Sequence, residues 1–258
     1  MLRPVAELFE FRQLLFALVA RDLRVRYKRS VLGVLWAFLE PLALMTLLTT
    51  VFSFLLRVPV ARYPAFALSG VIVWTFFHTG VTYALSAVSQ NAALVKKIYF
   101  PREILPLATV AGRGVHFALS LLLLAPFVVY FHIDVGASLL WLPALVVVQL
   151  MLIAGLALLF GALATLYEDA GFIVNFAFSG LFYLSPVFYS VEMVPAPWRG
   201  VYLLNPMAAL LDSYRAVLLE NHAPAAGPLL VATLVSLTTL VAGLLVFRRL
   251  AWRFAEVL

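Results

Sequence analysis

The side chains that could bind a nucleotide or a metal are few in this chain. None of the three lysines, Lys28, Lys96 and Lys97, stands in a G-x-x-x-x-G-K-[ST] motif, the loop that cradles phosphates in P-loop ATPases. Cysteine is absent and the four histidines are scattered, which excludes a disulfide framework and thiolate metal sites. We therefore expect no catalytic residue, no metal site and no cofactor in this chain.

Adjacent acids and serine–histidine pairs offer the remaining routes to catalysis. Glu168 and Asp169 are neighbours in sequence and would point different ways on a helix, so a solvated turn is the favoured interpretation. An integral-membrane enzyme that uses these two acids on lipid-linked sugars stays an alternative. Two serine–histidine pairs could meet in space without any support from their spacing, Ser69 with His78 and Ser179 with His116.

Two ionisable residues lie beside or within strongly apolar stretches. Glu40 precedes Pro41, and Arg113 lies between Gly112 and Gly114. An ionisable group at membrane depth is a functional candidate by default. Glu40 and Arg113 could pair, but we favour a position of Glu40 at the level of the cytoplasmic headgroups, where its charge costs little.

The composition requires a membrane to position these residues. Of the 258 residues 65% are hydrophobic and 12% are charged, and the mean hydropathy is +1.06, too apolar for one soluble core. A spanning helix needs about 20 mostly apolar residues. Six stretches meet that length and predict an all-α membrane protein, at 35–56, 64–86, 104–131, 139–166, 171–189 and 229–247.

The distribution of basic residues predicts the orientation. Thirteen of the 18 lysines and arginines fall before the first stretch, between the second and third, or after the sixth. The opposite face holds Arg57, Arg62, Arg199 and Arg215. Positive loops face the cytoplasm, so both termini are predicted to be cytoplasmic, with no cleavable signal peptide. The net charge of +6 indicates an anionic membrane surface rather than nucleic acid.

Three parts are expected along the chain. Residues 1–34 hold an amphipathic helix, 5–30, that lies in the cytoplasmic interface. Residues 35–247 form the transmembrane domain, and residues 248–258 form a cytoplasmic tail. Prolines and aromatics between 185 and 206 predict short, broken helices near the outer face, because irregular backbone at membrane depth must be buried in protein or line a cavity.

A short cytoplasmic segment at about 91–103 combines charge with apolar side chains. Positive-inside bias explains Lys96 and Lys97. It does not explain an exposed aromatic pair, Tyr99 and Phe100, next to Ile98, which is more typical of a protein contact. A plain loop and a docking site remain equal alternatives at this point.

Aromatic residues gather in the second and fifth stretches. Their rings could stack against the apolar C–H faces of sugars along an export path, or they could be ordinary packing or an interfacial belt. The candidates for the path are Trp74, Phe76, Phe77, Tyr83, Phe178, Phe182, Tyr183, Phe188 and Tyr189.

Several stretches taken together resemble the permease subunit of polysaccharide-exporting ATP-binding-cassette transporters, the group that includes O-antigen and teichoic-acid exporters. They occur in family order along nearly the whole chain. The stretches are Arg21-Asp22-Leu23-Arg24-Val25-Arg26-Tyr27-Lys28, Ser30-Val31-Leu32-Gly33-Val34-Leu35-Trp36, Glu40-Pro41, Leu94-Val95-Lys96-Lys97-Ile98-Tyr99-Phe100-Pro101-Arg102, Leu184-Ser185-Pro186-Val187-Phe188-Tyr189 and Leu204-Asn205-Pro206-Met207.

The resemblance implies half of a homodimer in the inner membrane that exports a lipid-linked polysaccharide, such as O-antigen, capsule or teichoic acid. ATP and Mg would bind to a separate cytoplasmic nucleotide-binding subunit. The coupling helix that docks on this ATPase would be the segment Lys96, Lys97, Ile98, Tyr99, Phe100, Pro101 and Arg102. A gate helix that meets the lipid pyrophosphate would contain Arg21, Arg24, Arg26, Lys28 and Arg29.

This chain departs from the family pattern in two places. Tyr167-Glu168-Asp169-Ala170 lacks the basic residue that is common after the fourth span. The sequence also continues only a short way past the sixth stretch, so we expect no carbohydrate-binding domain there. Export of a drug or a simple lipid by a related permease is a further alternative, which the aromatic content disfavours.

Overall fold

The computed structural model describes residues 10–27 and 32–258, and this part of the chain is helical with no strand. Five helical stretches are long and apolar enough to cross a membrane, Trp36–Leu55, Tyr63–Ser86, Ile104–Tyr130, Ala137–Leu166 and Ala226–Ala251. They coincide with five of the six predicted stretches, so the all-helical membrane fold is confirmed.

The helices follow one another through short turns. Their bounds are α2 Arg12–Tyr27, η1 Gly33–Leu35, α3 Trp36–Leu48, η2 Thr49–Leu55, α4 Tyr63–Thr82, η3 Tyr83–Ser86, η4 Ser89–Asn91, α5 Ala92–Lys97, α6 Ile104–Leu121, α7 Leu124–Tyr130, η5 Ala137–Trp141, α8 Leu142–Leu166, α9 Asp169–Tyr183, η6 Val191–Met193, α10 Ala196–Tyr202, α11 Pro206–Leu218, α12 Ala226–Ala251 and α13 Phe254–Val257.

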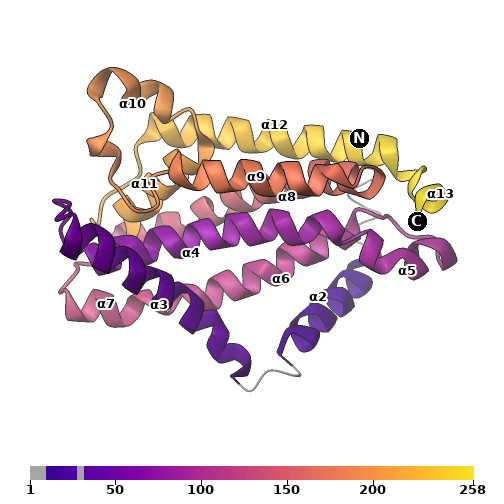
Figure 1. The fold of residues 1–258 in the computed structure, drawn as a ribbon, viewed down its shortest axis with the longest axis horizontal. Coiled ribbons are helices and arrows are strands. Elements are labelled where there is room, and N and C mark those ends of the chain that lie inside the picture. Colours follow the sequence, from indigo (N-terminus) through magenta and orange to yellow (C-terminus); the bar gives the residue numbers. More distant parts are fainter. Residues whose placement is uncertain (1–9, 28–31) are drawn as a thin grey trace.

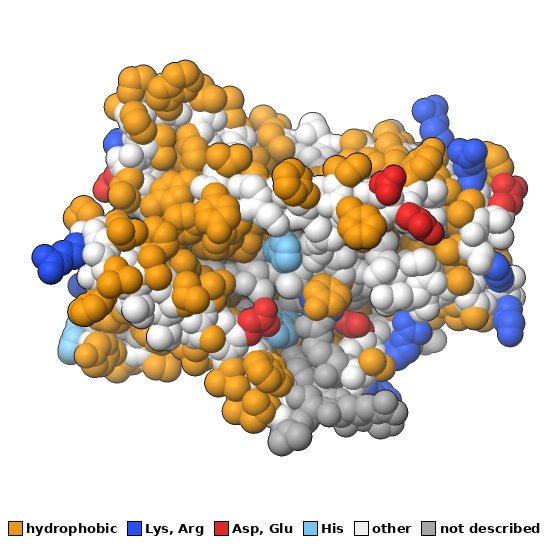
Figure 2. Space-filling view, viewed as in Figure 1, with side chains coloured by type: hydrophobic (Ala, Val, Ile, Leu, Met, Phe, Trp, Pro, Cys, Tyr) orange, Lys and Arg blue, Asp and Glu red, His pale blue; other side chains and the backbone are white. Residues whose placement is uncertain are grey.

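The long helices α4, α6, α8, α9 and α12 run along the long axis of the molecule, with α4 near its centre (Figure 1). The short helices α5 and α13 lie at one end, here called the α5 end, and α7 and α10 lie at the other, the α10 end. Lys and Arg side chains gather at the α5 end, whereas hydrophobic side chains cover much of the rest of the face in Figure 2. The α5 end carries the segments around Lys96 and around Arg248, which the sequence tally had placed on the same, more basic face.

The stretch predicted at 171–189 forms a shorter helix than expected. Helix α9 has 15 residues, a length of about 22 Å, which is less than the roughly 30 Å of a hydrocarbon core. It ends at Tyr183 because Pro186 follows closely, and a proline disfavours helical backbone in the residue before it. The structure therefore identifies five spanning candidates, and the sixth remains a prediction.

Two glycines bring α8 and α12 into close contact. A Cβ built on Gly155 would lie 2.5 Å from the backbone nitrogen of Leu240, and a Cβ on Gly243 would meet the carbonyl of Gly155. Any side chain at either position would separate the two backbones. Helix α12 also continues past the expected boundary at 247 to Ala251, so Arg248 and Arg249 belong to the helix rather than to a separate tail.

Candidate functional site

The segment predicted to dock on an ATPase lies at the α5 end. Lys96 and Lys97 form the last turn of α5, and the helix stops at Ile98, whose backbone is extended. The side chain of Tyr99 is 91% exposed, and Lys96, Lys97 and Ile98 are exposed as well. We call these four residues the docking ridge.

Phe100 is a correction to the expected aromatic pair. Its side chain is only 4% exposed and packs in a hydrophobic cluster with Leu18, Val95 and Phe254. The extended backbone at Ile98 precedes this inward turn of the chain. Tyr99 alone therefore presents an aromatic ring, and Phe100 anchors the ridge beneath it.

The C-terminal helices hold the docking ridge in place. Arg248 on α12 donates from Nε to Oε1 of Glu103 at 2.6 Å, and Glu103 is almost fully buried. Arg102 donates to the carbonyl oxygen of Ala251. A pocket of about 500 Å³ between these segments is also lined by Trp252. Sequence reasoning missed this support because the partners lie more than 140 residues apart in the chain.

Helix α2 connects the predicted gate helix to the same end. Leu18 is buried in the cluster around Phe100, and Nη2 of Arg21 donates to Oδ1 of Asn91 at 2.8 Å, one residue before α5. Arg24 is exposed. The side chain of Arg26, together with Lys28 and Arg29, falls outside the part of the chain that the structure describes, so the predicted basic cluster is only partly located.

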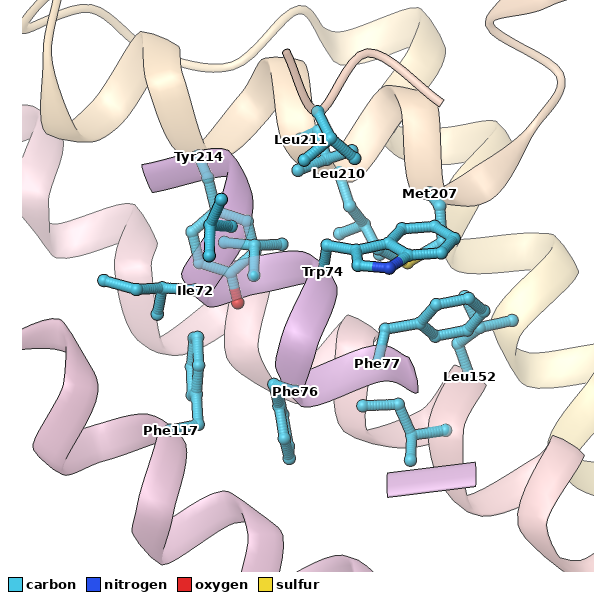
Figure 3. Packing of buried hydrophobic residues seen from close by; sticks show 14 of the residues in the cluster. Ile72, Trp74, Phe76, Phe77, Phe117, Leu152, Met207, Leu210, Leu211 and Tyr214 are labelled. Carbon is cyan, nitrogen blue, oxygen red and sulfur yellow. The ribbon is translucent and has the colours of Figure 1, made fainter. Parts of the chain in front are cut away.

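The aromatics of the second and fifth stretches do come together, but most of them are buried inside the chain. Trp74 lies 5.5 Å from Phe77 and 5.5 Å from Phe182 between ring centroids, and Phe77 lies 5.0 Å from Phe178. Figure 3 shows Trp74, Phe76 and Phe77 packed among aliphatic side chains. The members buried in this way are Trp74, Phe76, Phe77, Phe178 and Phe188.

These buried rings pack against other side chains of the chain in this structure, and their role along an export path stays a prediction. Phe182 and Tyr189 are half-buried, and the Tyr189 hydroxyl lies 2.9 Å from that of Tyr202. Only Tyr83 and Tyr183 are well exposed among the nine predicted path residues. The sequence could not reveal this, because aromatic spacing on a helix does not show which face points inward.

The broken segment after α9 is held by an arginine that sequence analysis had placed on the outer face. Arg215 of α11 is buried and donates to the carbonyl oxygens of Pro186 at 2.5 Å and Val187 at 2.7 Å. Its guanidinium carbon lies 3.5 Å from the ring centroid of Phe66. Burial lowers the pKa of Arg215 to about 9, although Asp212 opposes this shift.

Two of the stretches that carry the family resemblance, 184–189 and 204–207, meet beside Arg215. Asn205 caps α11 by accepting from the Met207 amide at 3.0 Å, and its Nδ2 donates to Oγ of Ser185 at 3.3 Å. The Tyr63 hydroxyl donates to the carbonyl oxygen of Phe188 at 2.8 Å. These bonds satisfy backbone groups that a broken helix would otherwise leave unpaired.

Ser69 and His78, one of the remaining catalytic candidates, lie on one helix, α4, nine residues or about 13 Å apart. Ser179 donates from Oγ to the carbonyl oxygen of Asn175 on its own helix, α9. Glu168 and Asp169 are exposed at the start of α9, as expected for a solvated turn. Within the described ranges, no group of three or more acids and histidines could hold a metal ion.

Glu40 and Arg113 form no ion pair among the described residues, although both line one pocket of about 440 Å³. Glu40 is exposed and Arg113 is buried. The favoured position of Glu40, at the level of the cytoplasmic headgroups, stays a prediction.

Comparison with known proteins gives one consistent result. Residues 13–219 match the family model described as ABC-2 type transporter. The chain is 32% identical to the O-antigen export system permease protein RfbA of Myxococcus xanthus over 262 residues, 99% of both chains. It is 30% identical to RfbA of Klebsiella pneumoniae over 95% of both, and 23% identical to the polysialic acid transport protein KpsM of Escherichia coli over 90% of this chain and 91% of KpsM. The chain belongs to the ABC-2 type transporter family.

Proposed function

We propose that this chain is the permease subunit of an ATP-driven exporter that moves a lipid-linked polysaccharide of the O-antigen or capsule type across the cytoplasmic membrane. The observation that carries the proposal is the similarity to an O-antigen export permease over essentially the full length of both chains. The five apolar helices and the absence of a phosphate loop in the sequence fit a membrane subunit that depends on a separate ATPase.

In this proposal the docking ridge meets a groove of the nucleotide-binding subunit on the cytoplasmic side. Tyr99 and Ile98 supply exposed apolar area, and Lys96 and Lys97 supply charge around it. An exposed tyrosine within a basic rim has the chemistry of an interface anchor. We also propose that two copies of the chain form a homodimer, with six spans per subunit and both termini in the cytoplasm. The exposed apolar face of α9 would then contact either lipid or the second copy.

The test is co-purification of this chain with the nucleotide-binding subunit of the proposed exporter. Tyr99→Ala should weaken the complex by about 2 kcal/mol, or roughly 30-fold in affinity, and should lower the coupled ATPase rate. Tyr130→Ala is the matched control, because Tyr130 is an exposed tyrosine at the opposite end of the molecule. A wild-type chain that captures no ATPase would refute the exporter proposal, and equal binding by both variants would refute the role of the docking ridge.

A further inference from the structure

A polar pocket opens where α2, α3 and α6 approach one another. Its volume is about 440 Å³, and its walls include Asp22, Trp36, Glu40, Tyr83, Arg113 and His116. Figure 2 shows acidic and histidine side chains near the middle of this face. The pocket is separate from the docking ridge and from the buried aromatic cluster of α4 and α9.

Arg113 is the unusual group in this pocket. It is only 4% exposed, yet its Nε and Nη1 have no hydrogen-bond partner among the described residues. Its guanidinium carbon lies 3.6 Å from the centroid of the Tyr83 ring. A buried cation without a carboxylate partner is costly, and an ionisable residue within an apolar helix points to a functional site. The unpaired Nε and Nη1 are shielded from solvent in this structure, but Arg113 forms part of the pocket wall, so its side chain calls for a ligand with acceptor oxygens.

Close packing brings a carboxylate near this cation. A Cβ added to Gly112 would lie 3.1 Å from Oδ2 of Asp22, so the glycine allows α2 to approach α6 beside Arg113. Glu40 contributes a second carboxylate from α3. Neither acid forms an ion pair in the described ranges, so both retain acceptor capacity for a ligand.

The combination of these groups selects the ligand class. A phosphate would be attracted by Arg113 but repelled by two carboxylates. A sugar instead offers hydroxyl donors to Asp22 and Glu40 and oxygen acceptors to Arg113. Trp36 and Tyr83 remain 52% and 51% exposed, and their rings present apolar surfaces that match the C–H face of a pyranose.

We propose that this pocket binds a sugar residue of the transported glycan. Arg113, Asp22 and Glu40 hydrogen-bond the hydroxyl and ring oxygens, while Trp36 and Tyr83 cover the apolar face. This inference rests on the proposed export function and gives it a recognition site. It moves sugar contact from the buried aromatics of α4 and α9 to a pocket beside the predicted gate helix.

The experiment uses the full chain purified with its ATPase subunit and the oligosaccharide released by mild acid from the host's own surface polysaccharide. Saturation-transfer NMR should show contact with sugar C–H protons in the wild type. Arg113→Gln and Glu40→Gln should each weaken binding about tenfold, as expected for loss of a hydrogen bond to a charged group. Arg57→Gln is the matched control, because Arg57 is exposed and outside the pocket.

The outcomes separate the pocket from the exporter. Glu40 is exposed, so Glu40→Gln tests the pocket even if Arg113→Gln fails to fold. Equal sugar binding by Glu40→Gln, Arg57→Gln and the wild type would overturn the inference, as would binding of inorganic pyrophosphate in place of the oligosaccharide. If the ATPase complex forms but the oligosaccharide does not bind, only the pocket fails. If the oligosaccharide binds through Glu40 but no ATPase is captured, the pocket stands and the export function fails.

Discussion

Tyr99 and Phe100 are consecutive residues with different roles, and this difference can be measured. Phe100→Ala removes a buried ring and should destabilise the chain by about 3–5 kcal/mol, because the cluster with Leu18 and Phe254 loses its filling side chain. Tyr99→Ala removes an exposed ring and should leave the melting temperature unchanged. Thermal unfolding in detergent, followed by tryptophan fluorescence, checks both.

A large fall in melting temperature for Tyr99→Ala would show that this residue packs against the chain rather than facing a partner. The comparison also explains why a double substitution of both residues is a poor probe of docking. Loss of ATPase binding by the double variant could arise from local unfolding around Phe100 alone.

The sequence predicted the roles of single side chains only where the residue type itself favours an exposed position, as a lysine does. Charged and aromatic composition located the ridge around Lys96 and Tyr99, but the inward turn at Phe100 depends on α2 and α13, which are distant in sequence. The sequence placed Arg215 among the basic residues of the outer face, where solvent would surround its charge. In the structure, two backbone carbonyls and the Phe66 ring replace that solvent.

At the scale of elements, the ion pair between Glu103 and Arg248 joins the docking ridge to the end of α12. Arg248→Met should lower the free energy of unfolding by about 3 kcal/mol, because it leaves the buried Glu103 carboxylate without its partner. Glu103→Gln combined with Arg248→Met should recover part of that loss, since no unpaired charge remains. Chemical or thermal unfolding of the four members of this cycle checks the coupling.

Arg249→Met is the control for this cycle, because Arg249 is the next residue of α12 and is exposed. Coupled ATPase activity should fall with Arg248→Met and remain with Arg249→Met. Additive effects of the two pair substitutions would contradict the role of the ion pair as a support for the docking ridge.

Element positions were predicted well where hydropathy alone decides them. Five stretches of apolar residues form helices long and apolar enough to span a membrane, within a few residues of the expected bounds. The end of α9 and the continuation of α12 to Ala251 were not predicted. Pro186 ends α9, but the course of the chain beyond the helix depends on the distant Arg215, which binds the carbonyl oxygens of Pro186 and Val187. The continuation of α12 depends on partners for Arg248 and Ala251 from the segment after α5.

At the scale of the whole molecule, the absence of cysteine makes the topology directly measurable. Single cysteines at Asp169, Met193 and Glu256 would each be the only thiol in the chain, and all three positions are exposed. We expect Asp169→Cys and Glu256→Cys to react with a membrane-impermeant maleimide only in inverted vesicles. Met193→Cys should react in intact cells whose outer membrane has been permeabilised.

This pattern would establish that the chain crosses the membrane between Asp169 and Met193 and again between Met193 and Glu256. Reaction of Asp169→Cys and Met193→Cys from the same side would contradict a sixth crossing and would remove the basis for placing both termini in the cytoplasm.

The short length of α9 has a consequence for the transport barrier. The helix covers about 22 Å of a hydrocarbon layer of roughly 30 Å, and beyond Tyr183 the chain continues with backbone carbonyls bound by Arg215. In the predicted crossing at α9, a glycan that passes outward would leave the part of the hydrocarbon layer lined by the helix about 8 Å before its outer edge. The free-energy penalty for dehydrating its hydroxyl groups would then extend over a correspondingly shorter distance, and fewer sugar units would have to shed their water at the same time.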